Sequence, residues 1–366
     1  MIVKTNVKLN LGLSVLRKRA DGFHDIETLF VPCFDFGDTL EIIDGDDYSR
    51  TSAALFAEYG GQDGCVGKFY DQKENEVDLA QGISEDGKLM ITIARKEGVD
   101  WNPMKDLCAK AYNVLAQDFD LPPVKIFLEK NAPVGAGLGG GSADAAFTLK
   151  ALNELCGLGL SGQRLSEYAS RLGSDCAFFI FNRPMIGSGR GEVLEPYDID
   201  LSEYEIKVLI PEGVSVSTAE AYKGIVPRET RRDGSGEQDS TGSPERCDGS
   251  GEQASTGSPE RCDGSGEQAS TGSPERCDRF SEQPGNPVVS HRSPTGLGKP
   301  AETTGLKSVL AEPVSEWKGL LVNDFEATVF KAHPELAAIK QSLYDSGATY
   351  ASMSGSGSAL FALYKK

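Results

Sequence analysis

A glycine-rich stretch from Pro133 to Asp144 carries the clearest chemical signal in the sequence. It reads PVGAGLGGGSAD and places five glycines within the seven residues 135–141. Glycine has no Cβ, so the backbone N–H groups of such a loop can approach an anion closely. If a helix follows the loop, its N-terminus adds roughly half a positive charge directed at the same point. The pattern predicts a phosphate-binding loop, and a flexible turn without a ligand is the alternative.

Two better-known phosphate-binding motifs do not describe this loop. The Walker A motif requires Lys-Ser or Lys-Thr after its last glycine, and neither follows Gly141 here. The loop also does not have the G-x-G-x-x-G form that closes a Rossmann unit. Both of these motifs are therefore excluded.

Two strands and one helix must position the loop. Apolar and polar residues alternate from Val3 to Leu11, which predicts a half-buried strand with Lys8 and Asn10 on one face. Residues 124–130 alternate likewise and lead into the loop. After the loop, apolar residues recur at helical spacing and a glycine stands where a helix would end: Ala145, Leu149, Leu152, Cys156 and Gly157.

The segment 133–143 resembles the phosphate-binding signature of the galactokinase, homoserine kinase, mevalonate kinase and phosphomevalonate kinase superfamily. VKLNLGL at 7–13 resembles the first motif of that superfamily, and SMSGSGSALFALY at 352–364 resembles the third. The resemblance implies an α+β fold of two domains. The N-terminal domain, residues 1–185, would be ribosomal-protein-S5-like and bind ATP, and the C-terminal domain, residues 186–366, would be ferredoxin-like and bind the acceptor.

Within this superfamily, four further segments resemble the family of kinases that act on 4-diphosphocytidyl-2-C-methylerythritol. They are ADGFHDIETLF at 20–30, LGSDCAFF at 172–179, GSGRGE at 187–192 and LVNDFE at 321–326. The resemblance covers most of 1–228 and 306–366, and is weak over 46–96. It implies ATP-dependent phosphorylation of the acceptor's 2-hydroxyl in the non-mevalonate isoprenoid pathway, with Mg²⁺ accompanying the ATP.

By this resemblance, Asp175 falls at the family's catalytic base and Lys8 at its catalytic lysine. The chemistry agrees, because an alcohol needs a nearby carboxylate to take its proton, and a lysine stabilises the developing oxyanion. The alternatives are that Asp175 caps a helix and that Lys8 is a solvated surface residue.

The resemblance also supplies the binding residues. Phe23, His24 and Tyr222 match the positions that hold cytosine, and Asn10 and Thr218 match those lining the methylerythritol end. As structural alternatives, His24 would be a satisfied polar residue beside a turn, and Tyr222 a core residue. The ATP phosphates would lie on Pro133, Gly135, Gly137, Leu138, Gly139, Gly140, Gly141 and Ser142.

The metal ligands stay open. The family usually has a second Ser or Thr after the glycines, where this sequence has Ala143 followed by Asp144. We expect Asp144 to cap the helix, and Mg²⁺ contact by Ser142 or Asp144 is the alternative. The basic run 17–19 could meet substrate phosphates, but such a run is usually a solvated loop.

The net charge of −18 is concentrated in part in a repeat of 15 residues. Three copies end at Cys247, Cys262 and Cys277, and they contain almost no large apolar residues. Such a segment cannot bury enough surface to offset its ordering entropy, so we predict a disordered insertion at about 229–304. A neutral tandem expansion is the favoured interpretation, and an interaction tail is the alternative.

The remaining features place the protein in the bacterial cytoplasm. The other five cysteines lack metal-binding spacing, which fits a reducing compartment, and no apolar run is long enough to span a membrane. No transit peptide precedes the first strand. We expect a small-molecule substrate and no nucleic-acid, membrane or obligate protein partner. The rival functions are another kinase of the superfamily, of mevalonate or homoserine type, and an inactive nucleotide-binding sensor or scaffold.

Overall fold

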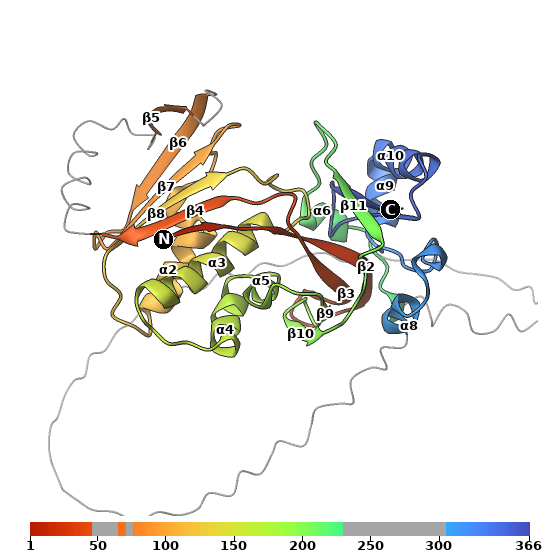
Figure 1. The fold of residues 1–366 in the computed structure, drawn as a ribbon, viewed down its shortest axis with the longest axis horizontal. Helices are drawn as coiled ribbons and strands as arrows, with labels where there is room; N and C mark the ends of the chain where they lie inside the picture. The colour runs from red at the N-terminus through yellow and green to blue at the C-terminus, as the bar shows by residue number, and fades with distance from the viewer. Residues whose placement is uncertain (46–64, 71–75, 230–304) are drawn as a thin grey trace, which may run out of the picture. The chain divides into compact units, whose positions relative to one another are not determined.

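The computed structural model describes residues 1–45, 65–70, 76–229 and 305–366 (Figure 1). Over these ranges the chain combines helices with three β-sheets, which confirms the predicted α+β class. The predicted insertion at about 229–304 lies outside the described residues except for Glu229.

A six-stranded sheet carries the N-terminal half of the chain. Its strand order is β1-β4-β8-β7-β6-β5, and β7 and β8 run parallel while the other neighbours are antiparallel. The strands are β1 Ile2–Lys4, β4 Thr39–Asp44, β5 Cys65–Tyr70, β6 Glu76–Ile83, β7 Leu89–Arg95 and β8 Val124–Lys130. The predicted strand at 124–130 is thus confirmed, and the glycine-rich loop follows it directly.

Two layers of helices lie on one face of this sheet (Figure 1). The α-helices α2 Leu107–Ala116 and α3 Gly140–Leu155 contact the strands, and α4 Gly162–Leu172 and α5 Cys176–Phe181 pack on those two helices. The 3₁₀ helix η1 Pro103–Lys105 contacts β6 and β7. The helix predicted after the loop is α3, and its Leu149 and Leu152 are fully buried. Gly157, with φ of 60°, stands one residue beyond the C-cap Cys156, as predicted.

A second sheet has the order β10-β9-β3-β2. Its strands are β2 Val7–Lys18, β3 His24–Cys33, β9 Met185–Ser188 and β10 Val193–Pro196. The prediction of a single strand from Val3 to Leu11 is wrong. The strand is interrupted at Thr5 and Asn6, and the two parts, β1 and β2, belong to different sheets.

The predicted half-burial of this strand is also wrong. Residues 7–15 of β2 are all buried, so both faces of the strand are covered. The polar face, which carries Lys8 and Asn10, contacts the phosphate loop: the Lys8 Nζ donates to the Gly137 carbonyl at 3.1 Å. An alternating sequence cannot distinguish water from a polar protein segment as the neighbour of its polar face.

The third sheet has the order β11-β13-β12, and α10 packs against β12 and β13. The elements of this part are β11 Tyr204–Leu209, α6 Thr218–Tyr222, α8 Leu306–Leu310, η3 Val314–Glu316, α9 Glu326–Ala332, α10 Pro334–Asp345, β12 Tyr350–Met353 and β13 Leu360–Lys365. One buried cluster joins Leu9 of β2, Leu138 of the loop and Phe361 of β13. The phosphate loop is therefore packed between the second and third sheets.

The domain boundary predicted between 185 and 186 stays a prediction. Strand β9 begins at Met185 and pairs with β3. None of the helices in the described ranges is long and apolar enough to cross a membrane.

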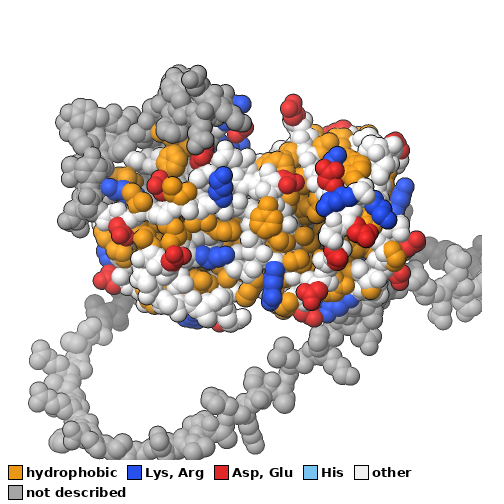
Figure 2. Space-filling model, viewed as in Figure 1, with side chains coloured by type: hydrophobic (Ala, Val, Ile, Leu, Met, Phe, Trp, Pro, Cys, Tyr) orange, Lys and Arg blue, Asp and Glu red, His pale blue; other side chains and the backbone are white. Residues whose placement is uncertain are grey.

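Acidic and basic side chains are interspersed over the described surface that Figure 2 shows. Nucleic-acid-binding proteins typically gather lysines and arginines into one continuous patch. The described part of this face has no patch of that kind.

Candidate active site

A cavity of about 850 Å³ opens where the phosphate loop, β2, the start of α5 and the start of α6 meet. It is lined by all the residues predicted to bind the ATP phosphates and by the predicted catalytic pair, Lys8 and Asp175. Asn10, Thr218 and Tyr222 also line it. Phe23 and His24 are the predicted site residues that do not, although both lie beside residues that do.

The phosphate loop depends on its glycines at specific positions. Gly135, Gly137 and Gly139 have φ of 74°, 77° and 74°, in the left-handed region that other residues rarely adopt. A Cβ at Gly137 would lie 2.4 Å from the Ser354 carbonyl oxygen. The loop can therefore approach the turn between β12 and β13 only because this residue has no side chain.

Lys8 and Asp175 come together within the cavity. The Lys8 Nζ lies 3.4 Å from an Asp175 carboxylate oxygen. It also donates to Asn10 Oδ1 at 2.5 Å and to the Gly137 carbonyl at 3.1 Å. The Lys8 side chain is only 4% exposed, so the alternative of a solvated surface lysine is excluded.

Asp175 precedes the first turn of α5 but does not cap it. Its carboxylate accepts no hydrogen bond from the helix backbone, so the capping alternative is excluded as well. The side chain is 28% exposed on the cavity side. A carboxylate that is accessible and next to a buried ammonium group is arranged to accept a proton from a bound hydroxyl.

Asn10 connects the catalytic strand to two neighbouring segments. Its side-chain amide donates to Thr28 Oγ1 of β3 at 3.1 Å, and its backbone N–H donates to Ser354 Oγ at 3.4 Å. Asn323 fixes the turn that contains Ser354, because its side-chain amide donates to the Met353 and Gly355 carbonyls at 2.8 Å. The LVNDFE segment at 321–326 therefore supports the third superfamily motif, at 352–364.

The rings predicted to hold a base are arranged as a stack. His24 and Tyr222 have centroids 4.7 Å apart and an interplanar angle of 18°. Burial lowers the pKa of His24, as does the charge of Lys18 to a smaller extent, so its imidazole stays neutral at pH 7. Burial and then the nearby Asp175 raise the pKa of Tyr222 to about 12.

Phe23 is placed differently from His24. The residue is 55% exposed, and the Arg190 guanidinium lies 5.1 Å from the centroid of its ring. Thr218, the remaining predicted acceptor-binding residue, lies 3.2 Å from Ser356 of the turn between β12 and β13, hydroxyl to hydroxyl. The sequence motifs thus come together from both ends of the chain.

Several cavity residues were missed by the sequence reasoning. Arg190 lies in the GSGRGE segment, which was recognised without a role for its arginine. Trp101 and Lys105 line the cavity together with Leu107, but the sequence around them resembles no motif. A single aromatic residue in a loop gives no signal that sequence reasoning could use.

The expectation that Asp144 caps α3 is wrong. Gly139 occupies the N-cap position, and the Asp144 side chain is 1% exposed and bonded to Lys130 at 2.6 Å. The basic run is also engaged elsewhere: Arg17 and Arg19 both pair with Asp25, and neither lines the cavity. The run is therefore solvated, as expected, but Arg17 and Lys18 are the exposed end of β2 and not part of a loop.

Over the described ranges, no group of three or more His, Cys, Asp or Glu residues is arranged to hold a metal ion. Mg²⁺ in nucleotide sites is usually held by one or two protein oxygens, substrate phosphates and water. Ser142, in the first turn of α3, lines the cavity, whereas Asp144 is buried against Lys130.

Comparison with known families defines the class of protein. Residues 106–183 match the GHMP kinases N terminal domain, and residues 308–366 match the GHMP kinases C terminal domain. The first match contains the phosphate loop and Asp175, and the second contains the third glycine-rich motif. Together with the site, these matches define a small-molecule kinase of the GHMP class.

Relatives that match over the whole chain specify the family. The 4-diphosphocytidyl-2-C-methyl-D-erythritol kinase of Azobacteroides pseudotrichonymphae is 34% identical over 100% of this chain and 94% of its own length. That of Parabacteroides distasonis is 33% identical over 100% of this chain and 92% of its own length. The chain therefore belongs to the family of 4-diphosphocytidyl-2-C-methyl-D-erythritol kinases.

Solved structures agree on the fold. A 4-(cytidine 5'-diphospho)-2C-methyl-D-erythritol kinase superimposes with a TM-score of 0.56 at 23% identity, covering 99% of this chain and 90% of its own. A mevalonate kinase superimposes with a TM-score of 0.52 at 10% identity, covering 100% and 91%. The choice of the cytidine-type kinase over the mevalonate and homoserine alternatives comes from the relatives that match over the full chain, and not from these structures.

Proposed function

We propose that this enzyme transfers the γ-phosphoryl group of ATP to the 2-hydroxyl of 4-diphosphocytidyl-2-C-methyl-D-erythritol. The products are ADP and the 2-phosphate of the acceptor, an intermediate of the non-mevalonate route to isoprenoid precursors. The observation that carries the proposal is the pair Lys8 and Asp175, 3.4 Å apart beside a phosphate-binding loop. The names of the full-length relatives support the choice of acceptor.

The proposed reaction begins with proton transfer from the acceptor's hydroxyl to the Asp175 carboxylate. The hydroxyl oxygen then forms a bond to the γ-phosphorus, and the bond from that phosphorus to the β,γ-bridging oxygen breaks. The electron pair leaves with ADP, and Asp175 later releases its proton to solvent. Lys8, held by Asn10 and the Gly137 carbonyl, stabilises the charge that develops on the attacking oxygen.

The nucleotide's phosphates are proposed to lie on the loop Pro133–Gly139 and the first turn of α3. Backbone N–H groups and the helix dipole favour anions at this position. The Ser142 hydroxyl would hold Mg²⁺ there, and the ion would neutralise phosphate charge when bound. Trp101 and Leu107 offer the adenine an apolar surface in the same cavity.

The cytosine is proposed to stack on the His24 and Tyr222 pair. A ring sandwiched between two others needs about 7 Å between the flanking rings, twice the ordinary carbon contact distance. The observed separation of 4.7 Å is too small, so the base stacks on an outer face of the pair or the rings separate to admit it. A neutral His24 can both donate to and accept from the base edge.

Arg190 is the side chain proposed to bind the acceptor's diphosphate. It lines the cavity and lies over Phe23, which neighbours His24 in the chain, while Gly191 lies close to Asp175. Arg190 Nε lies 3.4 Å from Glu192 Oε1, but its side chain is 36% exposed, whereas Lys8 and Lys130 are paired with carboxylates and are only 4% and 5% exposed. A guanidinium group matches the planar geometry of phosphate oxygens, which makes arginine suited to this role.

Coupled ADP release from the purified full-length protein tests the function. With ATP and Mg²⁺ present, we expect turnover of 4-diphosphocytidyl-2-C-methyl-D-erythritol and no turnover of mevalonate, homoserine or galactose. Nucleotide binding without turnover of any of these acceptors would favour the sensor alternative instead. Because the two named relatives belong to bacteria and the reaction consumes ATP, we place the enzyme in the bacterial cytoplasm.

A further inference from the structure

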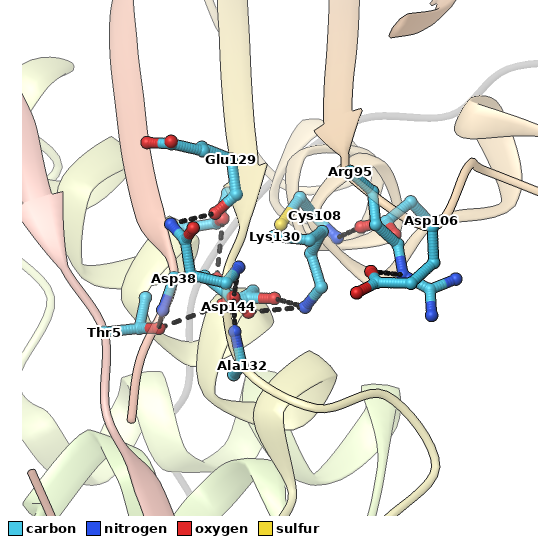
Figure 3. A network of polar contacts seen from close by, with 12 residues as sticks. Thr5, Asp38, Arg95, Asp106, Cys108, Glu129, Lys130, Ala132 and Asp144 are labelled. Carbon is cyan, nitrogen blue, oxygen red and sulfur yellow. Dashed lines mark hydrogen bonds and ion pairs between the residues drawn. The ribbon is translucent and has the colours of Figure 1, made fainter. Parts of the chain in front are cut away.

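A buried cluster of charges, shown in Figure 3, lies where β8 leads into the phosphate loop and takes no part in the proposed reaction. The Lys130 Nζ lies 2.5 Å from Asp38 Oδ2 and 2.6 Å from Asp144 Oδ2, and the three side chains are 5%, 0% and 1% exposed. Apolar residues in place of such a cluster often preserve stability or increase it. Its best-supported use is therefore to fix the relative positions of the segments that carry it.

The first of these carboxylates holds the start of the loop. Asp38 Oδ1 accepts hydrogen bonds from the backbone N–H groups of Asn131 and Ala132, both at 2.6 Å. These residues follow the end of β8 and immediately precede Pro133 (Figure 3). The chain is thereby fixed at the point where the sheet ends and the phosphate loop begins.

The second carboxylate holds the end of the loop. Asp144 lies four residues after Gly140, the first residue of α3, and accepts hydrogen bonds from Lys130 and from Thr5 Oγ1 at 3.1 Å. The Thr5 hydroxyl also accepts the backbone N–H of Asp38 at 2.9 Å. Lys130 therefore connects the two carboxylates, and Thr5 connects the Asp144 carboxylate to the Asp38 backbone, so that both ends of the loop are linked.

We propose that Asp38, Lys130, Asp144 and Thr5 are positioning residues that fix both ends of the phosphate loop and so set the affinity for the nucleotide's phosphates. The inference rests on the proposed function only in taking Pro133–Gly139 as the phosphate site. It assigns these residues no contact with the reacting atoms.

Isothermal titration of the full-length protein tests the proposal with two probes, a non-hydrolysable ATP analogue and adenosine. The variants are Thr5→Val, which keeps the side-chain shape, and Asp144→Asn, which keeps its size. Each loses a hydrogen bond involving a buried carboxylate, so we expect the dissociation constant of the analogue to rise about tenfold. Adenosine carries no phosphate for the loop to bind, so its dissociation constant should change by less than about twofold.

Matched controls separate positioning from general stability. Thr148→Val alters a buried threonine of the same helix, whose hydroxyl donates to the Asp144 backbone carbonyl at 2.7 Å. Lys340→Met alters a lysine that also bonds a carboxylate at 2.6 Å, in α10 and outside the cavity. Both controls should lower Tm and leave both dissociation constants unchanged.

Unchanged affinity for the analogue in both test variants would overturn the proposal, and so would equal weakening of the analogue and adenosine. Turnover of the cytidine acceptor is measured separately in the unmodified protein. A lack of turnover there would overturn the proposed function, while the dissociation constants of the analogue and adenosine would still decide the role of the four positioning residues.

Discussion

At the scale of single residues, the candidate site combines side chains that are far apart in the chain and differ in their chemistry. Asp175 is placed to accept a proton, Lys8 to stabilise an oxyanion, and His24 and Tyr222 to stack on a base. Because these roles are chemically distinct, substitution of each residue should affect a different measured quantity.

Substitution of Asp175 tests the proposed base. Asp175→Asn keeps the size of the side chain but removes its ability to take the proton, so kcat should fall by about 100-fold to 10,000-fold. The dissociation constant of ATP should change by less than about twofold. Steady-state kinetics and titration with ATP measure the two effects. Asp345→Asn, on α10 outside the cavity, is the control, and normal turnover in Asp175→Asn would remove Asp175 from the mechanism.

Substitution of Arg190 tests the diphosphate contact. Arg190→Ala should raise KM for the cytidine acceptor about tenfold, the effect of losing one hydrogen bond to a charged group. KM for ATP should stay the same. Arg164→Ala is the matched control, because its guanidinium also lies over an aromatic ring, Tyr168 at 5.0 Å, but outside the cavity. Equal acceptor KM values in the two variants would contradict the assignment.

The lowered pKa of His24 predicts how stability depends on pH. In the unfolded chain His24 takes up a proton near pH 6.5, whereas in the folded protein burial lowers the pKa of His24 below that value. The unfolded state therefore binds more protons, and stability is lost as pH falls through 6.5 toward the lower folded pKa. Thermal melts from about pH 7.5 to 5.5 should show a steeper loss in the wild type than in His24→Gln. Parallel curves would show that His24 does not contribute.

At the scale of elements, the phosphate loop is held between β2 and the turn that joins β12 to β13. The Lys8 N–H donates to the Leu138 carbonyl at 2.9 Å, and the Ala359 N–H donates to the Ala136 carbonyl at 3.1 Å. The loop therefore depends on close approach of the β2 backbone and of the turn between β12 and β13, as well as on the conformations that its glycines allow.

Gly137→Ala should disrupt this arrangement. The left-handed conformation alone costs a residue with a side chain about 1–2 kcal/mol. The new methyl group would also lie 2.4 Å from the Ser354 carbonyl oxygen, so the turn between β12 and β13 must move. We expect the free energy of unfolding to fall by more than about 2 kcal/mol and kcat/KM to fall at least about tenfold.

Gly159→Ala is the control for this prediction. Gly159 has φ of 67°, and a Cβ there would meet nothing within 4 Å. Only the backbone strain should appear, about 1 kcal/mol in chemical denaturation, with activity retained. If both variants lose the same stability and Gly137→Ala stays active, close approach at Gly137 is not required.

At the scale of the whole molecule, the described residues on either side of 230–304 contribute to one compact unit. The sequence of the intervening segment contains few apolar residues, and a long flexible connection adds closure entropy only slowly with length. Replacing residues 230–304 with a short Gly-Ser linker should therefore leave kcat and both KM values within about twofold of the wild type. A large loss of activity would show that the segment contributes to folding or to the site.

Much of the candidate site could be predicted from the sequence because it is carried by local patterns. Closely spaced glycines mark a backbone conformation that only glycine adopts easily, and the spacing of Leu149 and Leu152 reflects the period of α3. The positions of Lys8 and Asp175 came from family motifs, and the structure brings these two side chains together in the cavity.

Only the tertiary structure decided which partners the polar residues have. The sequence predicts that Asp144 lies near a helix N-terminus, but its bonds to Lys130 and Thr5 depend on how β1, β8 and α3 pack. The same is true of Arg190, whose place in the cavity depends on the pairing of β3 with β9. Backbone conformation follows from neighbours in the chain, whereas the pairing of charges depends on segments that only folding brings into contact.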